Sequence, residues 1–90
     1  MEEKFLIGDI VLSGAGRDKG KNFVVVSVDG IFAQICDGDL RKADKPKKKK
    51  QRHLKKTSGH SDYIAEKLMT DGKVTNTELR RAVAEFEEQF

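Results

Sequence analysis

The stretch "NFVVVSVDGIFAQICDGDL", residues 22–40, decides the fold. It contains two apolar, β-branched runs with the composition of strands, and the period of two in a strand assigns alternate residues to each face. The residues expected to share a face are Val24, Val26 and Val28 in the first run and Ile31, Ala33 and Ile35 in the second. Between the runs, Asp29 and Gly30 are the pair that a two-residue type I′ turn favours, so the stretch predicts a β-hairpin.

Further strands are expected on both sides of this hairpin. Upstream, residues 5–13 are apolar and β-branched, which predicts a strand with a bend or bulge at Gly8. Downstream, "DGDLRK" (37–42) predicts another turn and a short strand, and "RHLKKT" (52–57), with Leu54 among polar neighbours, predicts a last one. Four to five short strands in such a short span favour a small β-barrel, because closure removes exposed strand edges.

The period of the apolar residues changes after residue 60. From Ile64 onward they recur three and four positions apart, as on one face of a helix, and the pattern fits two short helices that form a C-terminal helical hairpin. Ser61 is suited to cap the first helix and Gly72 to end it, while "TNTE" at 75–78 has the S/T-x-x-E pattern of a capping box. We expect the apolar stripes to pack on each other or on the strands, and insertion into a groove of a partner protein is the alternative.

These patterns divide the chain into a β-rich unit and an appendage. The first unit spans 1–57 and includes a basic segment at 41–57, and the second is a two-helix extension at 58–90. The N-terminal "MEEKFLIGDIVL" is acidic at its start, and no apolar stretch approaches the length of a membrane span, so neither a secretory signal nor a membrane segment is expected. One cysteine, Cys36, cannot build a disulfide framework, which fits a cytoplasmic location.

Charge is distributed unevenly along the chain, although the net charge is only +3. Residues 1–40 hold four basic and seven acidic residues, a balance of −3, and residues 61–90 have the same balance. Residues 41–60 hold ten basic residues and one acidic residue, a balance of +9. Such a density of like charge repels itself, and a phosphate backbone is the commonest partner that offsets the repulsion, so nucleic acid is the first hypothesis.

Two other interpretations of the basic segment remain open. A lysine run without aromatic residues is compatible with a solvated linker, or with a segment that becomes ordered only on contact with a partner. The stretch "KPKKKKQR" (45–52) also resembles a nuclear-import signal, which is read by a receptor and is not itself a nucleic-acid site.

The stretch "SGAGRDKGKNF", residues 13–23, is called the glycine loop from here on. It superficially resembles the P-loop G-x-x-x-x-G-K-[ST], which must run into a helix so that backbone amides meet the phosphates. Ala15 stands where the first glycine is required, Asn22 stands where Ser or Thr is required, and a strand follows in place of a helix. A nucleotide-binding site is therefore not expected.

The glycine loop is better suited to lie against the phosphates of another molecule. Glycine allows positive φ and close approach of the backbone, while arginine and lysine supply cations. The residues expected to shape the loop are Gly14, Gly16, Asp18 and Gly20, and those expected to meet phosphate are Ser13, Arg17, Lys19 and Lys21. Asp18 would repel phosphate, so we expect it to brace Arg17 or to cap the turn. The alternative is a plain hairpin loop that happens to be basic.

No catalytic or metal-binding pattern is found. His53, His60 and Cys36 do not have a recognised zinc spacing, and the strand position of Cys36 argues for burial and against an activated nucleophile. Asp37 and Asp39 flank Gly38, and this composition is typical of a turn, so we do not interpret the two carboxylates as a catalytic pair. We therefore expect no enzyme activity, no metal, no cofactor and no small-molecule substrate.

From Ile10 onward, "IVLSGAGRDKGKNFVVVSVDGIFAQI" resembles a KOW motif, with an apolar start, Gly20 at the eleventh position and alternating apolar residues after it. The chain is similar to the small bacterial KOW-domain RNA-binding proteins, which are related to archaeal and eukaryotic large-subunit ribosomal proteins of the fourteen-e type. Its "AGRDKGK", "DGDLRK", "KPKKKK" and "HLKKT" segments carry the likeness, which is strong over 5–57 and looser over the helices. The resemblance implies an SH3-like barrel of four to five strands that binds structured RNA, most plausibly ribosomal RNA of the large subunit.

The expected function is non-catalytic RNA binding in a ribosomal protein or in a ribosome-associated, assembly or quality-control factor. Since Phe32 is the one aromatic candidate for base stacking, we expect recognition of the shape and backbone of folded RNA. The basic segment adds the candidate contacts Arg41, Lys42, Lys45, Lys47, Lys48, Lys49, Lys50, Arg52, His53, Lys55 and Lys56. Ribosomal proteins are possible partners of the helices. The alternative is a protein-interaction adaptor of the transcription or translation machinery with only nonspecific affinity for nucleic acid.

Overall fold

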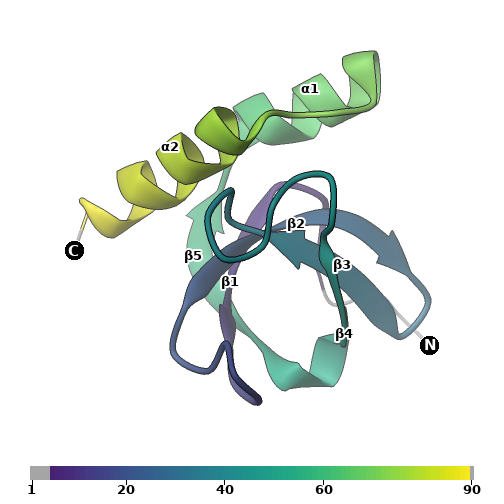
Figure 1. The fold of residues 1–90 in the computed structure, drawn as a ribbon, viewed down its shortest axis with the longest axis vertical. Coiled ribbons are helices and arrows are strands. Elements are labelled where there is room, and N and C mark those ends of the chain that lie inside the picture. Colours follow the sequence, from purple (N-terminus) through teal and green to yellow (C-terminus); the bar gives the residue numbers. More distant parts are fainter. Residues whose placement is uncertain (1–4, 90) are drawn as a thin grey trace.

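The computed structural model describes residues 5–89, and Figure 1 shows its fold. The elements in chain order are β1 (Asp9–Ser13), β2 (Asn22–Asp29), β3 (Phe32–Cys36), β4 (Lys47–Lys50), the 3₁₀ helix η1 (Gln51–His53), β5 (Leu54–His60), α1 (Asp62–Asp71) and α2 (Asn76–Glu87). Residues 1–4 and 90 of the expected units lie outside the described residues. The expectation of a mainly β protein with a helical appendage is confirmed.

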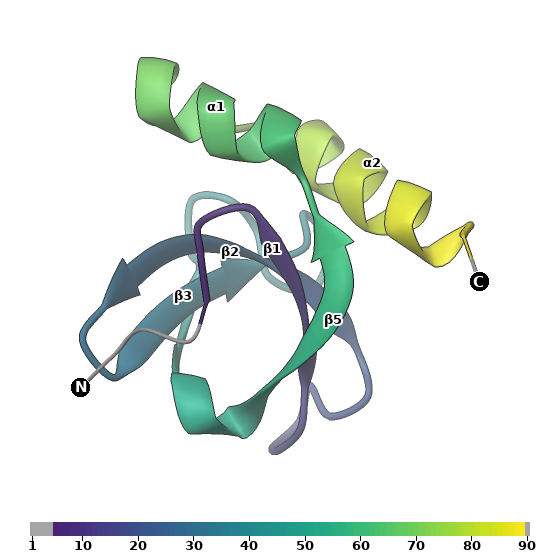
Figure 2. The same ribbon diagram turned by 180° about the vertical axis from the view of Figure 1, so that it is seen from behind.

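The five strands form one antiparallel sheet in the order β4-β3-β2-β1-β5. Figures 1 and 2 show that the sheet is strongly curled and that η1 connects its two edge strands, β4 and β5. The two helices lie across one end of the curled sheet in both views. The expected last strand is present, and it extends through β5 to His60.

The lysine run 47–50 is a strand, which corrects two expectations. The run is not a solvated linker, since it pairs with β3 from Ile35↔Lys47 to Phe32↔Lys50. The short strand expected within 37–42 is absent, because residues 37–46 form a loop. Lysine has a low strand propensity, but β3 needs hydrogen-bonding partners along its open edge, and this tertiary requirement prevails over propensity.

The predicted β2–β3 hairpin is confirmed, but its turn lies one residue later than expected. Asp29 pairs with Phe32, so that Gly30 and Ile31 are the two turn residues. Gly30 has a φ of 61°, whereas no residue other than glycine in the described chain has a positive φ. A glycine at the first central position is the requirement of a type II′ turn and not of type I′.

A β-bulge in β2 explains why the predicted faces are partly wrong. The register shifts between Val25 and Ser27, and the extra residue reverses the alternation beyond it. Val24 and Val26 face the helices, as the period of two requires, but Val28 packs on the opposite side of the sheet. The upstream strand also differs from its expectation, because β1 begins only at Asp9.

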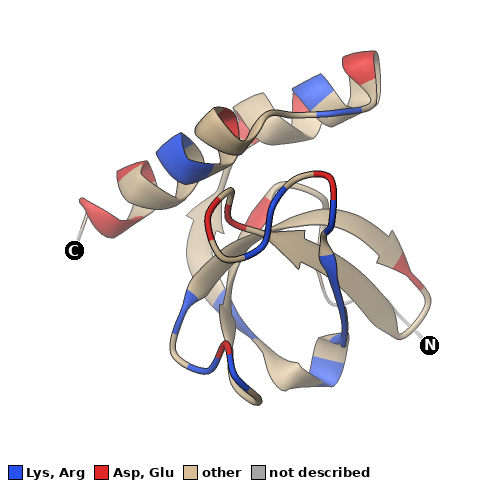
Figure 3. Ribbon diagram, in the orientation of Figure 1, with Lys and Arg blue, Asp and Glu red and all other residues tan. Residues whose placement is uncertain are grey.

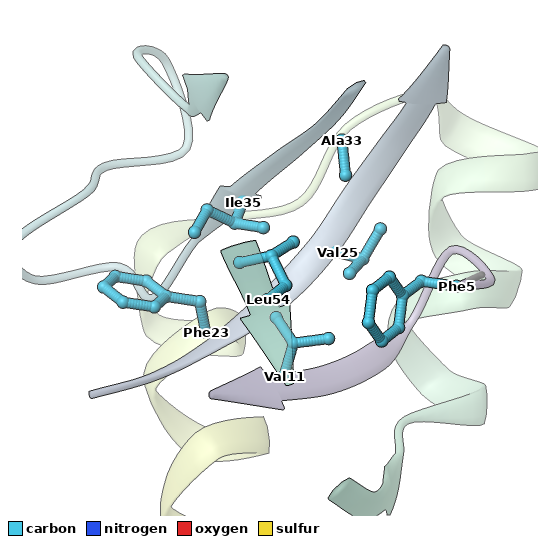
Figure 4. Packing of buried hydrophobic residues seen from close by; sticks show 7 residues of the cluster. All are labelled: Phe5, Val11, Phe23, Val25, Ala33, Ile35 and Leu54. Atoms are coloured by element: carbon cyan, nitrogen blue, oxygen red, sulfur yellow. The ribbon is translucent and has the colours of Figure 1, made fainter. Parts of the chain in front are cut away.

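The sheet is buried on both faces, so the protein has two apolar clusters. The inner cluster lies inside the curl and consists of Phe5, Val11, Phe23, Val25, Ala33, Ile35 and Leu54, whose side chains point toward one another in Figure 4. The outer cluster lies between the sheet and the helices and consists of Ile10, Val24, Cys36, Ile64, Leu79 and Ala82. Residues of both helices contribute to the outer cluster, so the expectation that the helices pack on the strands is confirmed.

Both helices begin, and α1 ends, as the sequence predicts. The Ser61 hydroxyl accepts a hydrogen bond from the Ile64 amide (3.1 Å), and α1 ends at Gly72 in the left-handed conformation. At the start of α2, the Thr75 hydroxyl accepts from the Glu78 amide (3.1 Å), and the Glu78 carboxylate accepts from the Thr75 amide (2.8 Å). This reciprocal pair is the predicted capping box.

The two helices do not form the expected side-by-side hairpin. Figures 1 and 2 show them extending in opposite directions from the place where α2 begins. There the Glu78 carboxylate accepts hydrogen bonds from the Lys67 ammonium (2.6 Å) and the Tyr63 hydroxyl. These bonds, that from Lys67 first, lower the pKa of Glu78 to about 2. The helices thus share the surface of the sheet and touch each other near this junction.

The approach of α2 to β5 is possible because residue 59 is glycine. A Cβ atom at Gly59 would lie 2.5 Å from the Phe86 ring and 2.9 Å from the Cβ of Ile10. Any larger side chain at this position would push α2 away from the sheet.

Candidate nucleic-acid interface

The glycine loop connects β1 to β2 and is held by its own backbone and by η1. Within the loop, the Gly20 amide donates to the Ser13 carbonyl (2.9 Å), and Gly16 and Gly20 both have positive φ. The Gly14 amide donates to the His53 carbonyl of η1 (2.9 Å), and a Cβ at Gly14 would lie 3.2 Å from that oxygen. Each of the three glycines therefore serves either a turn or a close approach, as expected.

The loop directs its acidic side chain inward and its basic side chains outward. Arg17, Lys19 and Lys21 are exposed, whereas Asp18 is only 4% exposed. The Asp18 carboxylate accepts hydrogen bonds from Nε (3.1 Å) and Nη2 (3.0 Å) of Arg41. The expectation that Asp18 braces Arg17 is wrong, because its partner is an arginine that follows it by 23 positions. The pair neutralises the carboxylate and leaves three cations on the outer side of the loop.

Arg41 was expected to contact RNA directly, but the structure gives it another role. Its guanidinium binds Asp18 through two nitrogens, and its side chain is 29% exposed. Its backbone carbonyl also accepts from the amides of Asp37 and Gly38 (both 3.0 Å). Arg41 therefore connects the glycine loop to the 37–41 turn.

Ser13 and Lys49 are also used inside the molecule. Ser13 is 1% exposed, so its hydroxyl does not lie on the surface where a phosphate could reach it, which corrects the expectation of a direct contact. The Lys49 ammonium donates to the Ser13 hydroxyl (2.7 Å) and to the Ala15 carbonyl (2.7 Å). Lys49 therefore fastens β4 to the base of the glycine loop, and its charge is turned toward the protein.

Of the other lysines of β4, Lys48 lies against Phe32. The Lys48 ammonium lies 4.6 Å from the centroid of the Phe32 ring, a cation–π contact. Because a cation covers one face of the ring, Phe32 is a poor platform for stacking a base. Lys47 and Lys48 are exposed, and Lys50 is half-buried.

The remaining basic residues fall into two groups. Arg52, His53, Lys55 and Lys56 are exposed on η1 and β5. They lie next to the glycine loop, because the Gly14 amide donates to the His53 carbonyl and Ser13 pairs with Leu54. Lys42 and Lys45 are exposed in the 37–46 loop near the helices. Figure 3 shows basic ribbon in the glycine loop, β4, η1 and β5, and acidic ribbon in the 37–39 turn and in α2.

Gln51 positions η1, although the sequence offered no signal for this. Its side-chain amide donates to the Gly30 carbonyl (2.7 Å), and its Oε1 accepts from the Phe5 amide (3.2 Å). Its backbone amide donates to the Ile31 carbonyl (2.8 Å). A buried glutamine thus ties η1 to the hairpin turn and to the start of the described chain, and these contacts hold the neighbouring Arg52 in place.

Cys36 and His60 both contact other parts of the protein. Cys36 is buried in the outer cluster, and burial, followed by the nearby Asp37 charge, raises its pKa to about 12. His60 lies 2.7 Å from the Asp9 carboxylate and 3.4 Å from that of Asp62. No group of three or more metal-ligating side chains is positioned to hold a metal ion within residues 5–89. In the same range, no helix is long and apolar enough to cross a membrane.

The comparisons with known proteins add no family assignment. Neither a scan against models of protein families nor a search among curated proteins found a match to this sequence. The functional proposal therefore depends on the residues and their geometry.

Proposed function

We propose that this protein is a non-catalytic RNA-binding protein whose glycine loop and neighbouring basic residues contact the phosphates of folded RNA. One observation carries the proposal. The glycine loop buries and neutralises its only carboxylate, Asp18, and presents Arg17, Lys19 and Lys21 to the outside. Because Asp18 is buried and paired with Arg41, a polyanion at the outer side of the loop would meet these three cations without facing the carboxylate between them. The exposed acids Asp39 and Glu87 lie beside Lys21, at the side of the loop that faces α2.

The surroundings of the loop support the same proposal. The base of the loop contacts η1 and β5, where Arg52, Lys55 and Lys56 extend the exposed basic surface. Backbone hydrogen bonds and the Lys49 bridge hold the loop in place, so binding costs little ordering entropy.

The proposal includes the KOW, SH3-like assignment and ribosomal RNA of the large subunit as the target. Five antiparallel strands, with a 3₁₀ turn between the last two and a basic glycine loop after the first, are compatible with the family that the sequence resembles. The class of RNA follows from the side chains. Because Lys48 covers one face of the Phe32 ring, stacking of unpaired bases is disfavoured, and paired RNA recognised through its backbone is favoured.

The test is a binding titration with a fluorescently labelled RNA hairpin that has a fully paired stem. We expect log affinity to fall linearly with log salt, with a slope of about −0.7 to −0.9 for each phosphate neutralised. An unpaired RNA of the same length should bind more weakly. A slope near zero, or stronger binding to the unpaired strand, would contradict the proposal. Crosslinking in cells followed by sequencing then identifies the RNA, and a scattered set of messenger RNAs would exclude the ribosomal target.

The adaptor alternative has one observation in its favour. Tyr63 and Met69 of α1 are 59% and 85% exposed, so this helix carries apolar surface that the sheet does not cover. Replacing Met69 with Lys leaves the outer cluster intact, and it should abolish capture of a protein partner if the adaptor alternative holds. Under the RNA proposal the same replacement leaves RNA affinity unchanged.

A further inference from the structure

The loop at residues 37–43 lies between the glycine loop and α2, and it is bonded to both. On one side, Arg41 holds the buried Asp18 carboxylate of the glycine loop. On the other side, Nη1 of Arg80 donates to the Gly38 carbonyl (2.7 Å), and the Ala43 amide donates to the side-chain oxygen of Asn76 (2.7 Å). A continuous set of hydrogen bonds therefore joins the first turns of α2 to the glycine loop.

Hydrogen bonds within the 37–43 loop hold its shape, so a shift of α2 would also shift the part of the loop that contacts the glycine loop. Asp37 Oδ1 accepts from the amides of Asp39 and Arg41 (both 2.9 Å), and the Arg41 carbonyl accepts from the amides of Asp37 and Gly38. Its contact with α2 is close, since a Cβ at Gly38 would lie 2.2 Å from the Asn76 carbonyl oxygen. With a φ of +80°, Gly38 is also in a conformation that favours glycine.

We propose that α2 positions the glycine loop for RNA through the 37–43 loop. Asn76 and Arg80 fix the 37–43 loop, and Arg41 carries this constraint to Asp18. The four side chains are positioning residues, which set RNA affinity without touching RNA. The helices are then part of the RNA-binding unit and not a separate appendage. This inference rests on the proposed RNA-binding function.

The charges of α2 provide a matched test. Arg80 and Arg81 are adjacent, exposed and equally charged, but it is Arg80 that donates the hydrogen bond to the Gly38 carbonyl of the 37–43 loop. We expect Arg80→Gln to weaken binding of the paired RNA hairpin about five-fold, the low end of typical coupling between sites. Arg81→Gln should change it by less than about two-fold, since a distant exposed charge is screened by salt. Equal effects of the two variants would overturn the proposal.

A second experiment separates positioning from direct contact. Arg80→Gln is combined with the triple variant Arg17→Gln, Lys19→Gln, Lys21→Gln. The triple variant removes the cations that the 37–43 loop is proposed to position. If Arg80 acts through the glycine loop, its effect disappears in this background, because coupled sites are not additive. If Arg80 touches RNA itself, the effects add, and the proposal is wrong.

A pair of variants at Asn76 distinguishes loss of positioning from loss of folding. Asn76→Ala removes the acceptor for the Ala43 amide, whereas Asn76→Asp keeps an oxygen in its place. We expect the first to lower RNA affinity and the second to restore it, with matching circular dichroism spectra for both. If Asn76→Asp fails to restore affinity, the proposal that α2 positions the glycine loop through the 37–43 loop is contradicted. If the triple variant of the glycine loop itself binds RNA normally, the proposed function fails instead, so the two failures are distinguishable.

Discussion

The glycine loop and strand β4 hold three and four basic residues respectively, and the structure uses these charges in different ways. In the loop, three cations point outward around a buried Asp18. In β4, Lys49 turns back to the Ser13 hydroxyl and the Ala15 carbonyl, and Lys48 lies on Phe32. The sequence makes the lysine run look like the stronger phosphate site. The structure shows that the charge a segment contains and the charge it presents are different quantities.

The largest expected effect compares the two segments directly. One variant carries Arg17→Gln, Lys19→Gln and Lys21→Gln, and its charge-matched control carries Lys47→Gln, Lys48→Gln and Lys50→Gln. At about 1 kcal/mol for each exposed ion contact, the loop variant should lose about 100-fold in affinity for the paired RNA hairpin.

The control should lose about ten-fold or less, because Lys48 is partly committed to Phe32 and Lys50 is half-buried. The salt dependence should also become less steep by about two to three for the loop variant. Both affinities are measured by fluorescence anisotropy over a range of salt concentrations. A larger loss in the β4 variant would reverse the comparison.

The next prediction concerns the buried acid of the glycine loop. Asp18→Asn raises the net charge by one, so simple electrostatics predicts tighter RNA binding. We expect weaker binding and a loss of about 1–2 kcal/mol in unfolding free energy, because the substitution removes charge-assisted hydrogen bonds from Arg41. Chemical denaturation and RNA titration measure the two effects. The matched control is Asp39→Asn on the exposed 37–41 turn, which should leave stability within about 0.5 kcal/mol of the parent.

A smaller effect distinguishes two neighbouring lysines of β4. Lys49→Met keeps an apolar stem but removes two charge-assisted hydrogen bonds, to the Ser13 hydroxyl and to the Ala15 carbonyl, which should lower the unfolding free energy by about 1 kcal/mol. Lys48→Met keeps its contact area with Phe32 and should change stability by less than about 0.5 kcal/mol. Urea titrations of the two variants provide the measurement. Equal stability of the two would show that the Lys49 bridge contributes nothing.

The smallest expected effect concerns the junction of the two helices, which lies away from both the glycine loop and β4. Glu78 has a folded pKa of about 2, below its ordinary value of 4.5. As pH falls, the unfolded chain binds a proton first, so the stabilising contribution of Glu78 is present above about pH 4.5 and is lost toward pH 2. Glu78 is half-buried and its partner Lys67 lies at the surface of the protein, so the contribution is screened in part and small.

Glu78→Gln retains the capping-box geometry but removes the ion pair with Lys67. We expect the variant to unfold in acid at nearly the same pH as the parent, with a slightly shallower pH dependence below 4.5. Circular dichroism over an acid titration measures this difference. A steeper dependence in the variant would contradict the sign of the pKa shift.

Local chemistry made part of the fold predictable. Turns, helix caps and the Thr75–Glu78 capping box are formed by residues a few positions apart, so each can be recognised from a short stretch of sequence. The bulge at residues 25–27 is not visible in this way, because Val26 looks like any other strand residue. One extra residue in β2 was enough to move Val28 to the opposite face.

The roles within the candidate site were harder to predict, since they depend on distant pairs. The sequence identified the glycine loop and its exposed cations, but it gave no reason to pair Asp18 with Arg41 and not with the adjacent Arg17. Strand β4 was not predicted because lysine is depleted in strands. The run forms a strand because it pairs with the edge of β3, and this partner cannot be recognised from the run itself. Ser13 was expected to offer its small hydroxyl to phosphate, yet that hydroxyl is buried and binds Lys49.

Strand β4 has a consequence for the behaviour of the protein in concentrated solution. It is the last strand on its side of the sheet, and its outer side is an edge onto which another strand could be added. Four consecutive lysines on a short edge strand make pairing with the same edge of a second molecule repulsive. Lysine acetylation along this run would remove that repulsion. The run therefore disfavours assembly of individual molecules edge to edge.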